Sequence, residues 1–163
     1  MYDAAVPVAL QALDRALALL DHATPDMLAA RLHADMFNCA EQFEIVAGFA
    51  LRATLPLVGR DVVERDCPHD IEALRVHLRS VRDEISSLTP ADFHGAAVRR
   101  IRHRAGFADL DQSGTEYLHH FAIPNLWFHL SMAFAILRSK GAAVGKADFD
   151  GLHDYPAGFS WVD

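Results

Sequence analysis

Hydrophobic residues recur every three or four positions along most of the chain, and this spacing predicts a mainly helical protein. The cleanest stripe runs through residues 71–88, where apolar side chains occupy one side and arginines and acids the other. The last predicted helix, near residues 123–140, is apolar on nearly all sides, which indicates that it is buried at the centre of the fold. The spacing predicts long helices near residues 3–21, 36–58, 68–88 and 123–140.

Capping signals predict where these helices begin and end. Thr24-Pro25 and Thr89-Pro90 each place a capping residue before a proline, which predicts two helix starts. Asp35 is the predicted cap of the second long helix, and Gly141 ends the last one. The inward stripes are expected to form a common core from Leu13, Leu17, Phe43, Val46, Leu74, Val81, Leu130 and Leu137.

Helical periodicity fails between Gly95 and His120, where glycines and a weak alternation indicate a small hairpin or an ordered loop. The tail after Gly141 has too few helix signals to be helical, and its aromatics are expected to pack on the helices: Tyr155, Phe159 and Trp161. The pattern therefore predicts an all-α chain. We expect an antiparallel four-helix bundle with a crossover connection before the last helix, as one domain spanning residues 1–163.

Charge and cysteine usage exclude several classes of protein. The formal net charge is −7 with the ten histidines counted neutral, which argues against a general nucleic-acid binder. Cys39 and Cys67 form no CxxC pair, and the apolar surroundings of Cys39 fit a reducing cytoplasm. The most apolar stretch, Ala122–Leu137, is short and interrupted by polar residues, so we expect no membrane span. A cytoplasmic protein is expected, since the N-terminus does not read as a signal peptide.

The last predicted helix carries two polar residues one turn apart, Asn125 and His129, on an otherwise apolar segment. The second helix offers a similar pair, Asn38 and Gln42. If these helices are neighbours, the four side chains could converge on a pocket. Amides are poor ligands for zinc or nickel and suit hydrogen bonding to a small polar ligand better. The alternative is a core histidine satisfied by hydrogen bonds, with exposed amides near the start of the second helix.

Two further groups of residues are candidates for chemistry. If His119 and His120 are extended, one points inward, and His120 could approach His129 to give a two-histidine site. That is short of the three protein ligands usual in a catalytic zinc site, so we expect no metal or other cofactor. The alternative is a pair of loop histidines. Four arginines form a basic strip that could bind an anion or could be the solvent-exposed face of a hairpin: Arg99, Arg100, Arg102 and Arg104.

Two segments carry a resemblance to a known family. PNLWFHLSMAFAILRSKGAAVGKADF, residues 124–149, and LHADMFNCAEQFEIVAGFA, residues 32–50, resemble a bacterial domain-of-unknown-function family within the DinB/YfiT-like metalloenzyme superfamily. The resemblance covers the whole chain, and its tail motif Gly145–Phe149 is fairly specific. It implies a four-helix bundle that is often a dimer. Typical members bind a divalent metal through one histidine of helix two and an HxxxH pair on helix four, and the best known are bacillithiol-, mycothiol- and glutathione-dependent transferases.

The resemblance assigns one of the three ligand positions to a histidine in this chain. His129 matches the second histidine of the HxxxH pair, and Asn125 takes the place of the first. The helix-two histidine falls near Asn38 or Gln42, and neither is a histidine. One of the three metal ligands is therefore retained.

We expect a DinB-like protein with a polar pocket between its helices, either a small-molecule-binding protein or a non-catalytic relative. The alternative is a divalent-metal-dependent transferase or hydrolase of the thiol-transferase type that uses His129 and His120, together with Glu41 or Asn125. A third hypothesis is a stress-related interaction protein that acts through its dimer surface. The sequence leaves the choice between binding and catalysis open. A homodimer is expected from the resemblance and from apolar residues outside the inward stripes, namely Phe49, Leu51 and Trp127.

Overall fold

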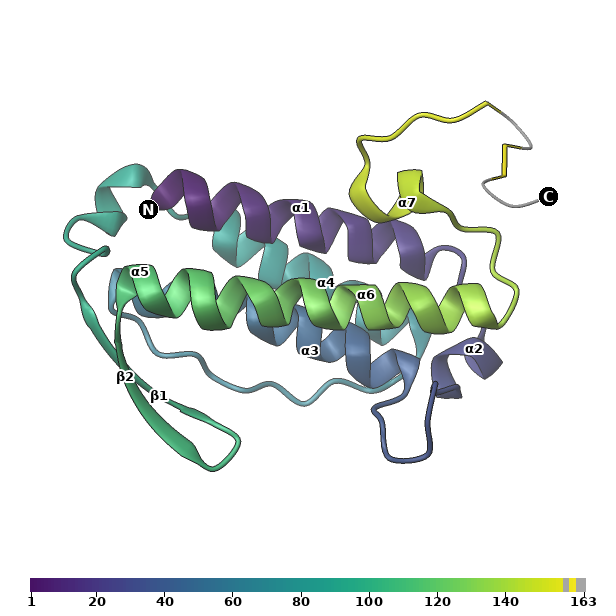
Figure 1. The fold of residues 1–163 in the computed structure, drawn as a ribbon, viewed down its shortest axis with the longest axis horizontal. Helices are drawn as coiled ribbons and strands as arrows, with labels where there is room; N and C mark the ends of the chain where they lie inside the picture. Colours follow the sequence, from purple (N-terminus) through teal and green to yellow (C-terminus); the bar gives the residue numbers. More distant parts are fainter. Residues whose placement is uncertain (157–158, 161–163) are drawn as a thin grey trace.

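The computed structural model describes residues 1–156 and 159–160. Long helices surround one core, and a two-stranded hairpin extends from one end (Figure 1). The elements in chain order are α1 (Tyr2–Leu20), α2 (Pro25–Ala29), α3 (Cys39–Arg52), η1 (Leu55–Val58), α4 (Ile71–Ser86), η2 (Pro90–Phe93), β1 (Arg100–Ala105), β2 (Ala108–Ser113), α5 (Gly114–Glu116), η3 (Tyr117–Ala122), α6 (Ile123–Ser139) and α7 (Lys146–Asp150).

The long helices do not alternate in direction along the chain. In Figure 1, α1 and α6 run one way, whereas α3 and α4 both run the other way. Residues 53–70 must therefore return along the length of the helices to join α3 to α4, and we call them the crossover segment. The sequence prediction placed the crossover before the last helix, which is wrong. Residues 87–113 connect α4 and α5 at the same end of the fold.

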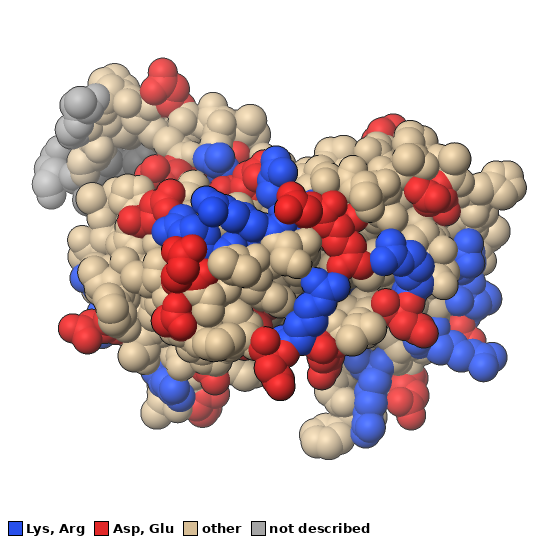
Figure 2. Space-filling view, turned by 180° about the vertical axis from the view of Figure 1, so that it is seen from behind, with Lys and Arg blue, Asp and Glu red and all other residues tan. Residues whose placement is uncertain are grey.

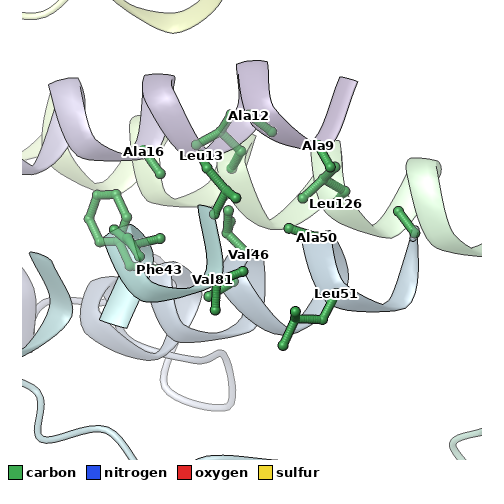
Figure 3. Packing of buried hydrophobic residues seen from close by; sticks show 14 of the residues in the cluster. Ala9, Ala12, Leu13, Ala16, Phe43, Val46, Ala50, Leu51, Val81 and Leu126 are labelled. Atoms are coloured by element: carbon green, nitrogen blue, oxygen red, sulfur yellow. The ribbon is translucent and has the colours of Figure 1, made fainter. Parts of the chain in front are cut away.

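Alanines bring α1 close to its neighbours. Along the buried face of this helix four alanines accompany the larger side chains: Ala5, Ala9, Ala12 and Ala16. Because small side chains let helix axes approach, α1 packs against α3, α4 and α6 (Figure 3). Leu13 is fully buried as predicted, whereas Leu17 is only partly buried because the alanine face turns it toward the edge of the core. The other predicted core residues are buried: Phe43, Val46, Leu74, Val81, Leu130 and Leu137.

The second long helix begins at Cys39 because Asn38 caps it. The Asn38 side chain accepts a hydrogen bond from Glu41 N at 2.9 Å, and Glu41 Oε2 accepts one from Asn38 N at 2.6 Å. This reciprocal pair satisfies two backbone donors that the first turn leaves free. The predicted cap, Asp35, lies three residues earlier in the exposed turn and instead pairs with His33.

Asn38→Ala should lower the free energy of unfolding by about 1 kcal/mol, since it removes the acceptor for Glu41 N. Asp35→Ala is the matched control and should change it by less than about 0.5 kcal/mol. Urea unfolding of the two variants beside the wild type measures both values. If Asp35→Ala were the more damaging substitution, the helix would begin earlier in solution than Cys39.

The last long helix begins much earlier than predicted. Gly114–Ser139 is one continuous helical stretch, and its part Tyr117–Ala122 is a π-helix. Pro124, two residues after the end of the π-helix, has no N–H to donate, and a wider turn accommodates that loss. By length and composition this stretch could cross a membrane, with a mean hydropathy of 1.3. Packing within the protein accounts for its apolar composition, because α6 lies along α3 and α1.

Of the two alternatives predicted between Gly95 and His120, a small hairpin or an ordered loop, the structure has the hairpin, so the chain is mostly helical with a small sheet and not purely α-helical. Strands β1 and β2 pair antiparallel, with Ile101 opposite Gln112 and Arg104 opposite Asp109. The hairpin then leads directly into α5.

A short helix, α7, stands in the tail that was predicted to be non-helical. Asp148 Oδ2 accepts a hydrogen bond from Gly145 N at 2.7 Å and closes its first turn. Phe149 of this helix packs on Trp127, with ring centroids 5.9 Å apart. Farther along, Tyr155 and Phe159 stack on each other at 5.0 Å. The expected packing of Trp161 falls outside the described residues.

The residues that suggested a homodimer make contacts within the chain. Leu51 is buried in the core, Trp127 packs on Phe149, and Phe49 lies against Phe121 with ring centroids 5.6 Å apart. The homodimer stays a prediction that now depends on the family resemblance alone. Light scattering at micromolar concentration tests it, and a mass of 18.0 kDa would contradict it.

Candidate functional site

A cavity of about 750 Å³ lies between α3, α6, the crossover segment and the tip of the hairpin. Residues Phe121, Asn125 and His129 form its floor on the last helix, at successive four-residue steps along one face. Residues 62–66 of the crossover segment and Arg104–Gly106 of the hairpin form two of its walls. We call this the main cavity.

His129 is held by a hydrogen bond to Gln42 across the α3–α6 interface. Its Nδ1 lies 2.7 Å from Gln42 Oε1, and the histidine side chain is only 8% exposed. Burial lowers the pKa of His129 to about 4, so the ring is neutral at physiological pH. Because the amide oxygen accepts, Nδ1 carries the proton and Nε2 carries a lone pair. His129 lines the main cavity, so this lone pair is an acceptor at the cavity floor.

Asn125 supplies a second acceptor one turn before His129. Its Nδ2 donates to the carbonyl oxygen of Phe121 at 2.7 Å, and this bond fixes the orientation of the amide. The amide oxygen is the atom left for a ligand, and no described residue is placed to donate to it. The floor therefore presents two neutral acceptors side by side.

Aromatic rings enclose these acceptors. Phe49 of α3 stacks on the His129 ring, with centroids 5.5 Å apart and an interplanar angle of 16°. Phe49 also meets Phe121 edge-on, and the Arg52 guanidinium lies over the Phe49 ring, 5.3 Å from its centroid. Phe37 and Phe128 flank the histidine near the surface, each about half exposed. The arrangement suits a molecule with an apolar part and a hydrogen-bond donor.

Ion pairs tie the crossover segment to α3 and so hold the cavity wall in place. His69 Nε2 lies 2.7 Å from Glu44 Oε2, and Arg52 Nη2 lies 3.2 Å from Glu64 Oε1. Exposed pairs of this kind add little to stability, and their role here is to position the chain. His103 of β1 packs against Phe121 of the floor, with the ring centroids 4.3 Å apart.

The structure brings together three of the five predicted site residues and leaves the other two elsewhere. Gln42 and His129 are in direct contact, and Asn125 shares the cavity floor with His129. Asn38 lies apart from them, because its side chain caps α3 and borders a different hollow beside α2. His120 and its neighbour His119 are exposed on the π-helical turn. The extended geometry that would have aimed His120 at His129 is therefore wrong.

Sequence reasoning missed the wall residues of α3. Ile45, Phe49 and Arg52 follow Gln42 at steps of three, four and three, which is one helical stripe beside the buried one. This spacing could have placed Phe49 and Arg52 next to the pocket. Nothing in the local sequence indicates that residues 62–66 cover the same face, because that depends on the path of the crossover segment.

The donor atoms at the cavity floor do not fit a transition-metal site. Zinc-type sites take imidazole, thiolate or carboxylate, with at least three protein ligands. Here one imidazole nitrogen is accompanied by amides, and Gln42 is engaged with the same imidazole through Nδ1. In the part of the chain that the structure describes, no three His, Cys, Asp or Glu side chains are grouped to hold a metal ion. The donor set around His129 is therefore that of a hydrogen-bonding site and not of a transition-metal site.

Asn125→His should create metal affinity, because it places a second imidazole one turn before His129. We expect zinc affinity to rise at least about tenfold over the wild type, measured by competition with a chromogenic chelator on tag-free protein. Asn38→His is the matched control, since it adds a histidine at the helix cap and should have no such effect. Near-stoichiometric zinc, nickel or iron in the wild type, lost in His129→Ala, would contradict our interpretation of the donor set.

The fold and this site define a DinB-like helical protein. The crystal structure of a DinB family member protein from Shewanella denitrificans is similar to this chain, with 30% sequence identity and a TM-score of 0.84. The match covers 96% of this chain and 94% of that one. The chain belongs to the family described as Domain of unknown function (DUF1993), which matches residues 1–150. The search of curated proteins found no match to this chain.

Proposed function

We propose that this protein binds a small polar molecule in the main cavity, as a cytoplasmic DinB-like relative that lacks the full metal triad. The hydrogen bond from His129 Nδ1 to Gln42 Oε1 carries the proposal. It leaves Nε2 as an acceptor, and Asn125 Oδ1 adds a second one beside it. The complementary ligand group is a donor such as an amine, a hydroxyl or a thiol, with its apolar part against Phe49 and Phe121.

Binding is favoured over proton-transfer chemistry by the basicity of His129. An efficient general base has a pKa near the working pH. Burial lowers the pKa of His129 to about 4, so Nε2 is a weak base that stays unprotonated at physiological pH and keeps its lone pair for a hydrogen bond. The alternative, a divalent-metal-dependent transferase or hydrolase, needs ligands that the donor set around His129 does not supply.

Propylamine, propanol and propanethiol are suitable probes, because they share an apolar part and differ in the donor group. Long-range proton–nitrogen NMR reports on the two ring nitrogens of His129 during titration. A bound donor should shift the Nε2 resonance and leave Nδ1, which is bonded to Gln42, nearly unchanged. The series then ranks the donor groups that the site prefers.

The control removes both partners of the buried hydrogen bond, so that neither is left unpaired. His129→Phe with Gln42→Leu keeps an aromatic ring and apolar volume, and such paired replacement is nearly neutral for stability. This double variant should lose probe binding, measured by calorimetry, while His119→Ala on the exposed turn keeps it. If the double variant bound all three probes as well as the wild type, His129 would not be the acceptor and the proposal would fail.

A further inference from the structure

A second cavity, of about 460 Å³, lies between the crossover segment and strand β1. One acidic residue, Asp61, lines it beside six arginines, and we call this cavity the arginine cleft: Arg52, Arg60, Arg99, Arg100, Arg102 and Arg104. Such a concentration of guanidinium groups is unusual for a chain with a net charge of −7. The cleft is therefore a local positive region on an acidic protein.

The carboxylates around the cleft do not neutralise it, because two of them are shared. Asp111 accepts from Arg100 Nε at 2.9 Å and lies 3.4 Å from Arg102 Nε. Glu84 likewise receives two guanidinium groups, at 2.7 and 2.6 Å, from Arg60 and Arg65. Within the cleft, the sharing of Asp111 leaves one positive charge in excess, whereas Arg65 lies outside the cleft. Arg52 and Arg104 pair with carboxylates of their own, Glu64 and Asp109. Figure 2 shows Lys and Arg atoms interspersed with Asp and Glu over the back of the molecule, including the lower right, where the hairpin lies.

Arg99 is the arginine of the cleft best placed to bind a ligand. Its Nε donates to the carbonyl oxygen of Leu57 at 3.1 Å, which anchors the half-buried side chain. Within the described residues, no carboxylate lies within 4.0 Å of its guanidinium. Gly59, at φ +77°, makes room for it, since a Cβ there would lie 2.8 Å from Arg99 Nη1. The two terminal nitrogens form an anchored fork of the kind that binds carboxylate or phosphate.

The arginine cleft and the main cavity adjoin each other. Arg52, Val62, Arg104 and Phe121 line both of them. Arg52 stands at the junction, with its guanidinium over the Phe49 ring that also stacks on His129. We propose that the arginine cleft binds an anionic group, a phosphate or a carboxylate, of the same small molecule that hydrogen-bonds to His129. This inference rests on the proposed function and makes the ligand bifunctional, with a donor at one end and an anion at the other.

The cleft is tested first by itself, with inorganic phosphate and with acetate as probes. Calorimetry at low ionic strength should detect binding that weakens as salt is added, and the two probes show which anion the site prefers. Arg99→Gln should weaken the preferred anion about tenfold or more, as expected for loss of a charged two-point contact. Arg99→Lys keeps the charge but lacks the two-nitrogen fork, so its affinity for the anion should lie between those of the wild type and Arg99→Gln. Arg79→Gln, an exposed arginine on α4 outside both cavities, should leave the affinity unchanged.

The bridging of the two cavities is tested with 6-aminohexyl phosphate beside hexylamine and inorganic phosphate. The bifunctional probe should bind at least about tenfold more tightly than either part, because the second contact becomes intramolecular. Arg99→Gln should remove this gain and leave hexylamine binding as it was. Hexylamine that binds with no gain from the phosphate would overturn the inference while the proposed function stands. Phosphate that binds while hexylamine leaves His129 undisturbed would instead overturn the proposed function, and with it the bridging ligand.

Discussion

Gly114→Ala should destabilise the protein by about 3 kcal/mol or more, which corresponds to a fall of about 10 °C in Tm. A Cβ at this position would lie 1.9 Å from the carbonyl oxygen of Ala96 and 3.1 Å from Leu57 Cδ2. Backbone atoms cannot move aside as a flexible side chain can. The first turn of the last helix therefore has to separate from the residues before the hairpin, where Thr115 N bonds to Ala97 O at 3.1 Å.

Gly145→Ala is the matched control for this substitution. A Cβ there meets only Asp148 Oδ2, at 3.9 Å, and the backbone is in a region open to all residues. Its effect on the free energy of unfolding should stay within about 0.5 kcal/mol. Urea unfolding of both variants provides the comparison. Equal and small effects would mean that Gly114 is not in contact with Ala96 in solution.

Periodicity predicted the buried helix faces well because burial and spacing are local properties of a helix. The stripe on α4 is the clearest example, since Leu74, Leu78, Val81 and Ile85 are all fully buried. On α1 the same reasoning favoured leucines and overlooked alanines, so Leu17 was placed in the core that Ala16 occupies. Hydrophobicity identifies the apolar side of a helix, whereas the distance to the neighbouring helix decides which residue on that side lies at the centre of the core.

The amides of α3 show why the candidate site was only partly predictable. Asn38 and Gln42 are one turn apart and looked equivalent, yet one caps the helix and the other bonds to His129. A cap depends on the conformation of a single residue, and Asp35 carried an equally good signal. The reach of Gln42 to His129 depends on the α3–α6 contact, which the sequence pattern could only suppose.

The crossover segment was the larger omission, because its role is set by topology. Only residues 59–67 of this segment lie outside the predicted helices, and the path of residues 53–70 along the helices follows from the shared direction of α3 and α4. This path places Val62 and Glu64 over the main cavity and Arg60 beside the arginine cleft. The basic strip of β1 was visible in the sequence, but the arginines it meets across the cleft come from this segment and from α3.

The stability of the protein should fall by about 3 kcal/mol as the pH is lowered from about 6.5 to about 4, through His129 alone. Burial lowers the pKa of His129 from 6.5 to about 4 in the folded protein. Between these two values the unfolded chain binds a proton at this residue and the folded chain does not. Proton uptake therefore favours unfolding, so that stability rises with pH across this window and levels off above it.

Other groups titrate as well, so the measurement has to be a difference between two proteins. His77 lines the same cavity, and its pKa is also lowered by burial, which adds a loss of stability in the same direction. The pKa of Asp150 is lowered to about 2, chiefly by a hydrogen bond from Leu152 N. The stability that Asp150 contributes is lost below the ordinary aspartate range, beneath the window of His129. Both groups are present in the His129→Phe, Gln42→Leu protein and cancel in the comparison.

Urea unfolding at pH 7 and pH 4.5 should therefore show a steeper loss of stability for the wild type than for the double variant. The double variant lacks the titrating ring and the buried amide together, so it gains no unpaired polar group that would obscure the result. If both proteins lost the same stability between the two pH values, His129 would have a nearly ordinary pKa and would be open to water. The neutral acceptor at the cavity floor depends on that burial, so this comparison tests the physical basis of ligand binding before any ligand is identified.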